Sequence, residues 1–554
     1  MSHQSELVKT DITAYLKEHA DKQQLSLLTC GSVDDGKSTL IGRLLYDSKL
    51  IYEDQLAAVA ADNAKSGTTG EKIDLSLLVD GLQAEREQGI TIDVAYRYFS
   101  TAKRKFIIAD TPGHEQYTRN MVTGASACDL AIILIDARSG VKTQTKRHSF
   151  IASLLGIKHV IVAVNKMDLV GYEEAVFTEI CEEFARFSSQ LNLEDIHMIP
   201  LSALDGDNVV HLSEHMSWYK GDTLMQTLES IEVSADKNMT DMRFPVQYVN
   251  RPNLDFRGYC GTVASGLIEV GKDVVVYPSM KKSKIKSIIT YDGELEKAYP
   301  PMAITATLED DIDVSRGDVI LFPDNLPQMS RQLTASIVWM SEEPLKVGRL
   351  YDFKHSTRNI TGQVSNINEL IDVNTLESSQ GGNSLKLNEI AKCNVHFNSE
   401  IAFDLYTSNK AFGSFIIIDR LTNVTVGCGM IEGISQTDKD DLQCVSSEEL
   451  AARYGHKGGV IKLSSKVSEH EIDCIRRVLF DEGLHVVALI DEDGELQKNN
   501  LGASVLSIVE SGLVCVMGEE NFDHNEMPIL LLDKDLVSDP KTLSKQLSIF
   551  KSDS

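Results

Sequence analysis

The sequence predicts a multidomain protein. It has an α/β domain with a doubly wound, mostly parallel sheet, then two β-barrel domains and a small C-terminal α/β domain. Between residues 24 and 240, short apolar runs alternate with helical segments, and the run at 130–135 suits a strand buried on both faces. After residue 240, apolar and polar residues alternate and glycines recur at turn positions, which is typical of β-barrels. In residues 450–554, short apolar runs again alternate with helical segments.

The first domain, residues 24–240, follows an expected helical extension over residues 1–23, where Leu7, Ile12 and Leu16 have roughly helical spacing. Its strands are expected at 25–30, 105–109, 130–135, 160–164 and 196–201. In an open α/β sheet, ligands bind outside the carboxyl ends of the strands. The loops after these strands are therefore the places where functional residues are expected.

The two barrel domains are expected at residues 241–329 and 330–434, and a polar linker at 435–449. Their alternating apolar faces include Phe244, Val246 and Tyr248 in the first barrel and Leu333, Ala335, Ile337 and Trp339 in the second. Such period-two faces predict strands with one side toward a core.

The C-terminal domain, residues 450–554, is expected to have strands at 460–463, 486–490, 513–517 and 529–532. Between the first two, a helix places Ile472, Ile475, Val478 and Leu479 on one face and ends at Gly483. The first strand, this helix and the second strand predict a βαβ unit.

Composition limits the class of function. The chain has 554 residues, 42% of them hydrophobic and 25% charged, which excludes a wholly disordered protein. Its net charge of −28 disfavours a protein whose main function is to bind the nucleic acid backbone, because the phosphates would be repelled. No nucleic-acid partner is therefore expected. Residues 281–286, Lys-Lys-Ser-Lys-Ile-Lys, are either a solvated strand with Ile285 inward or a local RNA-facing stripe.

Cysteine usage and hydropathy indicate the compartment. The nine cysteines are scattered, without a CxxC or metal-like spacing, as in a reduced cytoplasmic protein. The first residues do not resemble a secretory signal, and no apolar run approaches about 18 residues, so no membrane partner is expected.

A glycine-rich loop follows the first expected strand. Residues 31–38 fit the pattern GxxxxGK[ST] and precede a helical segment at 39–45, which is the context that the motif requires. Backbone N–H groups of such a loop cradle phosphate oxygens, Lys37 bridges the outer phosphates, and the Ser38 hydroxyl ligates Mg²⁺. The residues expected to contact the nucleotide here are Gly31, Ser32, Val33, Asp34, Asp35, Gly36, Lys37, Ser38 and Thr39.

Three further segments, each after an expected strand, complete a site for GTP. Asp110 can hold Mg²⁺ through water, and the Gly113 N–H can sense the γ-phosphate. The Asp168 carboxylate can accept two hydrogen bonds from the guanine N1–H and amine, a donor pair that adenine lacks. The expected contact residues are Asp110, Thr111, Pro112, Gly113, His114, Asn165, Lys166, Met167, Asp168, Ser202, Ala203 and Leu204, the last three supporting the guanine O6 with a backbone N–H.

Thr91 and His114 are the candidate switch residue and water-orienting residue. A hydroxyl and carbonyl at Thr91 would complete the Mg²⁺ shell only when a γ-phosphate is present, so the expected metal ligands are Ser38, Thr91 and Asp110. His114 is placed to orient the attacking water, and its alternative role is that of a structural turn histidine. The expected catalytic residues are His114, Lys37 and Thr91.

These motifs resemble a known family. Residues 24–235 resemble the GTPase domain of translation factors of the elongation factor Tu and 1-alpha kind, and the barrels resemble the second and third domains of that superfamily. Within it, the stretches at 78–93, 110–127, 135–149 and 419–427 are similar to the large, GTP-hydrolysing subunits of two-subunit bacterial sulfate adenylyltransferases. The resemblance covers about residues 10–433.

The resemblance implies a role in sulfate activation. In that family the large subunit hydrolyses GTP, and this drives a partner small subunit to transfer AMP from ATP to sulfate, giving adenosine 5′-phosphosulfate and diphosphate. It implies a heterodimer, or an assembly of several such heterodimers, that uses GTP as substrate and Mg²⁺ as cofactor. It also implies that Val33 and Ile90 gate His114 and that Asp34 helps to hold a monovalent cation, while Asp35 stands where elongation factors have histidine.

Two other functions compete with this reading. One is an elongation-factor-like GTPase that carries aminoacyl-tRNA, which basic stripes on the barrels would favour. The other is a scaffold that works without nucleotide, which the complete GTP site disfavours.

The C-terminal segment resembles an adenylylsulfate kinase that lacks its phosphate loop. Residues 452–457 and 477–483 are similar to the start and first helix of that kinase, but residues 464–470 read Ser-Ser-Lys-Val-Ser-Glu-His. Without a glycine cradle and its lysine, phosphoryl transfer is not expected. The resemblance implies an inactive domain that docks an adenylylsulfate kinase, stabilises the assembly or binds the sulfonucleotide product. The alternative is a generic βαβ unit without shared function.

Overall fold

The computed structural model describes residues 23–48, 75, 93–233, 238–253, 256–375, 377–435, 447–463, 469–489, 502–518, 527–532 and 545–550. The chain divides into two compact units. The first comprises Met1–Thr240 with Asp372–Glu377, and the second comprises Asp241–Ile371 with Ser378–Ser554. The expected extension over residues 1–23 lies almost wholly outside the described residues.

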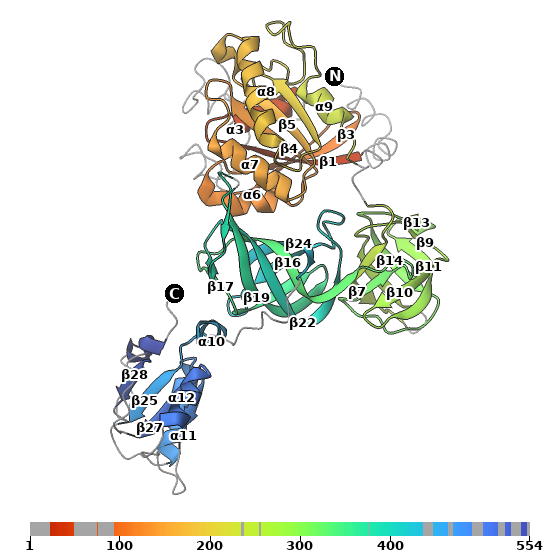
Figure 1. Ribbon diagram of the computed structural model, residues 1–554. Helices are drawn as coiled ribbons and strands as arrows, with labels where there is room; N and C mark the ends of the chain where they lie inside the picture. The colour runs from red at the N-terminus through yellow and green to blue at the C-terminus, as the bar shows by residue number, and fades with distance from the viewer. Residues whose placement is uncertain are drawn as a thin grey trace. The chain divides into compact units, whose positions relative to one another are not determined.

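The first unit is built on a six-stranded sheet in the order β2-β3-β1-β4-β5-β6. Strands β1, β3, β4 and β5 of this sheet are labelled in Figure 1. Its neighbours are parallel except β2 and β3, which form an antiparallel edge. The strands are β1 (Gln23–Gly31), β2 (Ala95–Ser100), β3 (Arg104–Asp110), β4 (Leu130–Asp136), β5 (His159–Asn165) and β6 (Asp195–Pro200). All five expected strands are present. The sixth, β2, escaped prediction because Phe99 is its only buried residue.

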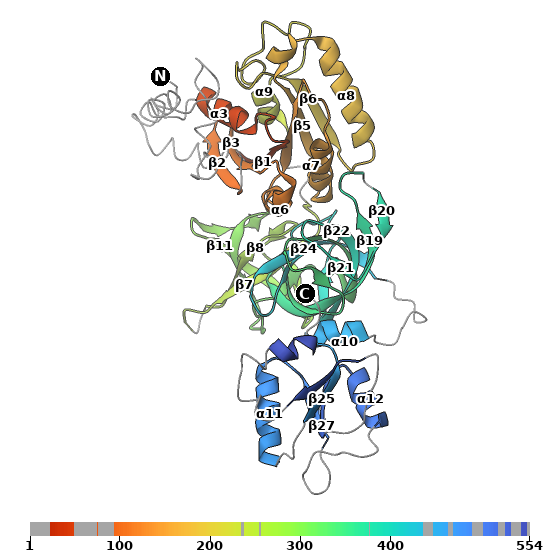
Figure 2. The same cartoon turned by 90° about the vertical axis from the view of Figure 1, so that its left-hand side faces the viewer.

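Helices cover both faces of this sheet. Apolar side chains of α3 and α9 share one core with alternate residues of β1, β3 and β4. In Figure 2, α8 and α9 lie on opposite sides of strands β5 and β6. The helices are α3 (Lys37–Asp47), α6 (Thr118–Ala125), α7 (Thr143–Leu154), α8 (Glu174–Ser188) and α9 (Leu224–Ser230), with 3₁₀ turns η2 (Glu115–Tyr117) and η3 (Met167–Val170). The doubly wound α/β prediction is therefore confirmed.

The first antiparallel barrel follows the order β10-β15-β7-β8-β14-β11-β12 and is closed by pairing of β10 with β11. Its strands are β7 (Arg243–Asn250), β8 (Gly258–Thr262), β10 (Asp273–Tyr277), β11 (Lys281–Thr290), β12 (Gly293–Leu295), β14 (Ala303–Leu308) and β15 (Val319–Leu321), and β9 (Ile268–Glu269) pairs separately with β13 (Lys297–Ala298). On β11 the four lysines are exposed and Ile285 is fully buried, an arrangement that fits both a solvated strand and an RNA-facing stripe.

The second barrel follows the order β18-β23-β24-β16-β22-β19-β20 and is closed by pairing of β18 with β19. Its strands are β16 (Gln328–Trp339), β18 (Leu350–His355), β19 (Arg358–Ile371), β20 (Ser378–Gln380), β22 (Ile390–Phe403), β23 (Ser414–Ile418) and β24 (Thr425–Ile434), and β17 (Leu345–Lys346) pairs with β21 (Ser384–Leu385). The apolar face expected on β16 is buried throughout.

The apolar face expected on β7 is wrong at Tyr248. Phe244 and Val246 are buried in the barrel core, but Tyr248 is 63% exposed. The pairing of β7 with β8 shifts register between Val246 and Tyr248. This bulge inserts one extra residue, so Val249 packs against the core in place of Tyr248.

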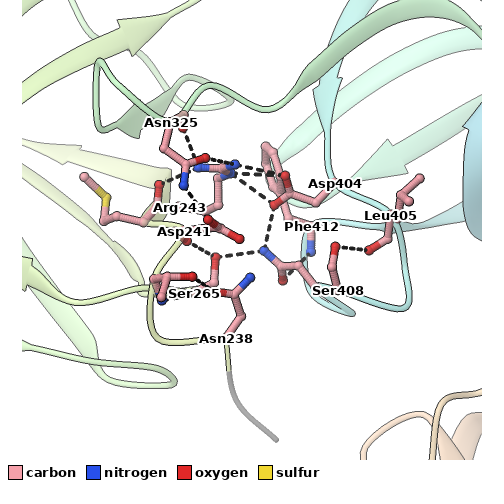
Figure 3. Close-up of polar contacts among 12 residues, drawn as sticks. Asn238, Asp241, Arg243, Ser265, Asn325, Asp404, Leu405, Ser408 and Phe412 are labelled. Atoms are coloured by element: carbon pink, nitrogen blue, oxygen red, sulfur yellow. Dashed lines mark hydrogen bonds and ion pairs between the residues drawn. The ribbon is translucent and has the colours of Figure 1, made fainter.

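A buried ion pair joins the two barrels. Arg243 on β7 is 2% exposed, and its Nη2 lies 3.0 Å from Oδ1 of Asp404, which follows β22. Asn409 donates from Nδ2 to Oδ2 of Asp404 at 3.0 Å and to Oγ of Ser265 at 2.8 Å. The Arg243 Nη1 also donates to the carbonyl oxygen of Asn325 at 3.0 Å. Figure 3 shows Arg243, Ser265 and Asn325 converging with Asp404.

The C-terminal part contains a parallel four-stranded sheet in the order β26-β27-β25-β28. Its elements are α10 (Ser447–Tyr454), β25 (Gly459–Leu463), α11 (Glu469–Asp481), β26 (Val486–Ala488), α12 (Gly502–Glu510), β27 (Val514–Gly518), β28 (Ile529–Leu532) and η7 (Leu547–Phe550). Figure 2 shows α11 and α12 on opposite sides of this sheet. The expected βαβ unit runs from β25 through α11 to β26. Its two strands are not neighbours in the sheet, because β27, which comes later in the sequence, lies between them.

In the described parts of the chain, no helix has the length and hydropathy needed to cross a membrane.

Candidate functional site

The phosphate loop between β1 and α3 has the backbone geometry of an anion cradle. Asp34 and Gly36 adopt left-handed conformations, with φ of 67° and 93°. Alternation of right- and left-handed residues turns successive N–H groups toward one concavity. A Cβ on Gly36 would lie 2.4 Å from Nδ2 of Asn165, so this position requires glycine. Helix α3 begins directly after it at Lys37, which adds a helix N-terminus to the cradle.

Lys37 is held inside this loop. Its Nζ donates to the carbonyl oxygens of Gly31 at 3.1 Å and Ser32 at 3.0 Å, and the side chain is 7% exposed. Burial lowers the pKa of Lys37, and the nearby carboxylates of Asp110 and Asp35 oppose that shift. The ammonium group is thus positioned where phosphate oxygens would enter the loop.

Asp110 and Gly113 lie against the same loop. Asp110 ends β3 and is 1% exposed, and its Oδ1 accepts from Oγ1 of Thr29 at 3.4 Å. A Cβ on Gly113 would lie 2.6 Å from the carbonyl oxygen of Gly31 and 2.7 Å from Nζ of Lys37. The chain at Gly113 therefore passes the loop at a distance that leaves no room for a side chain. The neighbouring Thr111 is anchored through Oγ1 to the Thr29 carbonyl at 2.9 Å.

The oxygen donors beside the loop fit a magnesium ion. Mg²⁺ prefers one or two carboxylate or hydroxyl oxygens together with phosphate oxygens and water. Ser38 lies in the first turn of α3 and the buried carboxylate of Asp110 ends β3. Thr91, the third expected ligand, and Ile90, the expected gate residue, lie outside the described residues. Val33, the other expected gate residue, is 37% exposed.

His114 follows the loop-facing glycine and is exposed. Its Nδ1 accepts a hydrogen bond from the backbone N–H of Gln116 at 3.3 Å, and its ring meets Tyr117 edge-on with centroids 6.1 Å apart. A neutral imidazole that accepts at Nδ1 carries its proton on Nε2. This geometry suits His114 for orienting a water molecule by donating to it.

Asn165 and Lys166 connect the base side of the site to the phosphate loop. Asn165 donates from Nδ2 to the carbonyl oxygen of Asp35 at 2.8 Å, and its Oδ1 accepts from the N–H of Ala203 at 2.9 Å. The Lys166 Nζ donates to the carbonyl oxygen of Asp34. Segments more than a hundred residues apart in sequence are therefore hydrogen-bonded at one edge of the sheet.

Asp168 and the 202–204 loop occupy the base side of the same edge. Asp168 is half-buried in the first turn of η3, and Met167 beside it is fully buried. Arg43 of α3 donates from Nε to the carbonyl oxygen of Ala203 at 3.1 Å and also donates to that of Leu204. The N–H of Ser202 donates to the Asp207 carbonyl at 3.2 Å. Two of the three N–H groups expected to support the guanine O6, those of Ser202 and Ala203, thus have acceptors within the protein.

Sequence reasoning missed a layer of charged residues behind the site. Asp136 at the end of β4 is 3% exposed and accepts from Nη2 and Nε of Arg138 at 2.6 and 3.0 Å. It also lies 3.1 Å from Nζ of Lys166. Burial alone would raise the pKa of Asp136, but the hydrogen bonds from Arg138 and Lys166 hold it well below its usual range. Lys142 lies 3.3 Å from Oδ1 of Asp35.

Comparisons with known proteins agree with this geometry. Residues 22–231 match the family described as elongation factor Tu GTP binding domain, and residues 332–432 match the GTP-eEF1A C-terminal domain-like family. The chain is 63% identical over 430 residues to sulfate adenylyltransferase subunit 1 of Teredinibacter turnerae, covering 78% of this chain and 92% of that one. It is 62% identical over 432 residues to the protein of the same name from Cellvibrio japonicus, covering 78% and 91%.

A longer match extends into the C-terminal part. The chain is 53% identical over 521 residues to the bifunctional enzyme CysN/CysC of Rhodopirellula baltica. That match covers 90% of this chain and 80% of the relative.

Proposed function

Because this chain belongs to the family of sulfate adenylyltransferase subunit 1, we propose that it is the GTP-hydrolysing, energy-coupling subunit of a sulfate adenylyltransferase. The identity of 63% over 430 residues is the observation that carries the proposal. In this reaction AMP passes from ATP to sulfate, giving adenosine 5′-phosphosulfate and diphosphate, the first step of sulfate assimilation. The adenylyl transfer takes place on a partner small subunit, with which this chain forms a heterodimer.

The residues of the chain bind and orient GTP. The loop N–H groups and the ammonium of Lys37 hold the phosphates, and Asp168 accepts from the guanine N1–H and amine. Asn165 keeps these two halves in register through its bonds to Asp35 and Ala203. Ser38 and Thr91, with Asp110 through water, would hold Mg²⁺, which would neutralise charge on the phosphates. His114 orients the attacking water by donating from Nε2.

Two further roles are proposed, one for Asp34 and one for the C-terminal part of the chain. We propose that Asp34, an exposed residue in a left-handed conformation within the loop, helps to hold a monovalent cation. Residues 450–554 act as an inactive kinase-like domain that docks an adenylylsulfate kinase. The 521-residue match to a bifunctional enzyme continues past residue 434 and supports a relationship between this part and that enzyme.

GTP turnover by the purified chain tests the proposal. We expect slow turnover by the chain alone, and acceleration only when the small subunit, ATP and sulfate are all present. The energy-coupling role would be wrong if turnover ignored all three. Acceleration by ribosomes or aminoacyl-tRNA instead would favour the elongation-factor-like alternative. Omitting sulfate alone is the matched control, because the partner and both nucleotides are then unchanged.

A further inference from the structure

The phosphate loop is itself acidic, although its ligand is anionic. Asp34 and Asp35 lie within the loop and Asp110 lies beside it. Asp35 is 1% exposed, so water screens its charge poorly. Its Oδ2 accepts from the backbone N–H of Ser32 at 2.6 Å, which places the carboxylate within the loop. Lys37 offsets part of this charge, but its ammonium is also the group expected to hold the phosphates, so a second cation beside Asp35 would reduce the repulsion of an entering phosphate.

Lys142 is placed to supply the compensation. Its Nζ lies 3.3 Å from Oδ1 of Asp35, the carboxylate oxygen that does not accept from Ser32. The backbone of Lys142 is fixed at the N-cap of α7, where its N–H donates to Oγ1 of Thr145 at 3.3 Å. One residue thus connects the start of α7 to the centre of the phosphate loop.

The same segment also supports the base side of the site. Asp136, six residues before Lys142, holds Nζ of Lys166 at 3.1 Å, and Lys166 in turn donates to the Asp34 carbonyl. Residues 136–142 therefore contact both halves of the nucleotide site without belonging to either motif.

We propose that Lys142 is a positioning residue for nucleotide retention. It neutralises Asp35 beneath the phosphates and so keeps the loop closed on GTP and GDP. The inference rests on the proposed function, because its ligand is a guanine nucleotide. It adds a determinant of dissociation rate that none of the nucleotide motifs contains.

The proposal predicts the direction in which two substitutions change the rate of GDP dissociation. Lys142→Met removes the hydrogen-bonded cation of Asp35 and leaves Lys37 as the cation still coupled to that carboxylate. GDP should then dissociate about tenfold faster, the size of one lost charge-assisted hydrogen bond. Adding Asp35→Asn to that variant removes the charge that needed compensation, so dissociation should slow again toward the wild-type rate. A lysine with a merely structural role would not be rescued by changing Asp35.

Stopped-flow release of fluorescent methylanthraniloyl-GDP from the full chain measures these rates. Lys146→Met is the matched control, because Lys146 is a half-buried lysine one turn along α7 that packs over Phe187, 5.8 Å from the ring centroid. Lys142→Arg should keep the wild-type rate. The melting temperature of each nucleotide-free variant checks folding, and Lys142→Gln replaces Lys142→Met if the latter does not fold.

The outcomes separate this inference from the proposed function. Fast release by Lys142→Met, with rescue by Asp35→Asn and an unchanged Lys146→Met control, supports it. A wild-type rate in Lys142→Met, or a further acceleration on adding Asp35→Asn, overturns the inference alone. Failure of the wild-type chain to bind the labelled GDP overturns the proposed function as well.

Discussion

Among single residues, Asp168 should determine which base the site accepts. Its carboxylate offers two acceptors to the guanine N1–H and amine. In Asp168→Asn, the amide nitrogen donates where guanine also donates, so GDP affinity should fall by at least about 100-fold. Xanthine carries a carbonyl in place of the amine, so the variant should bind xanthosine diphosphate better than the wild type does. Competition of GDP and of xanthosine diphosphate with labelled GDP measures the affinity of each protein for both nucleotides.

The Asn165 network provides the check on that experiment. Asn165 links Asp35 of the phosphate loop to Ala203 on the base side. Asn165→Ala should therefore weaken GDP and xanthosine diphosphate alike. A uniform loss in Asp168→Asn as well would mean that Asp168 supports the loop and does not read the base.

Among the elements, strand positions and motif residues could be predicted because each rests on local pattern. The conformation of the apolar run at 130–135 and of the glycines in the phosphate loop can be predicted from a few neighbouring residues. Lys142 could not be predicted as part of the site, because its contact with Asp35 depends on β4 pairing beside β1. Tyr248 was misplaced for a similar reason, since a bulge depends on the partner strand and breaks the period-two pattern.

On strand β18, His355 gives the second barrel a pH-dependent stability. It is 3% exposed, its ring Nε2 lies 3.1 Å from the Phe412 carbonyl oxygen, and burial lowers its pKa to about 4. The unfolded chain protonates this histidine near its usual value of 6.5, while the folded chain does not. Its contribution is therefore complete above about pH 6.5 and is lost as pH falls toward 4.

Urea unfolding at pH 7.5 and 5.5 measures this effect. The free energy of unfolding should fall by about 1 kcal/mol from His355 over that interval. His355→Gln keeps a donor for the Phe412 carbonyl without titrating, so its loss should be smaller. Trp339, buried in the same barrel core, reports the transition in a Trp218→Phe background. Equal pH dependence in both proteins would exclude His355 as the source.

In the molecule as a whole, the Arg243–Asp404 pair determines how firmly the two barrels are joined. Arg243→Met leaves a carboxylate that is 12% exposed without its cation, and should cost about 3–5 kcal/mol of stability. Combining it with Asp404→Leu should recover much of that loss, because no unpaired charge remains. Urea unfolding of the full chain compares the variants. Arg257→Met is the matched control, since its partner Asp311 is 75% exposed and such pairs contribute about 0–1 kcal/mol.

This connection between barrels lay beyond sequence reasoning. Composition and motifs indicate the class of each domain, but Arg243 and Asp404 are 161 residues apart and belong to no motif. If Arg243→Met proved no more costly than Arg257→Met, the buried apolar cluster that includes Tyr277 and Phe412 would carry the association of the barrels instead.

The strand order of the C-terminal sheet has a consequence for synthesis on the ribosome. β25 pairs with β27 and β28, and β26 pairs with β27. Among the described strands of this sheet, no two are therefore neighbours until Val514–Gly518 has been made. Until then Val460 and Ile461, fully buried in the finished protein, have no strand to cover them. We therefore expect the nascent C-terminal part to remain unfolded and accessible to chaperones after the preceding domains have folded.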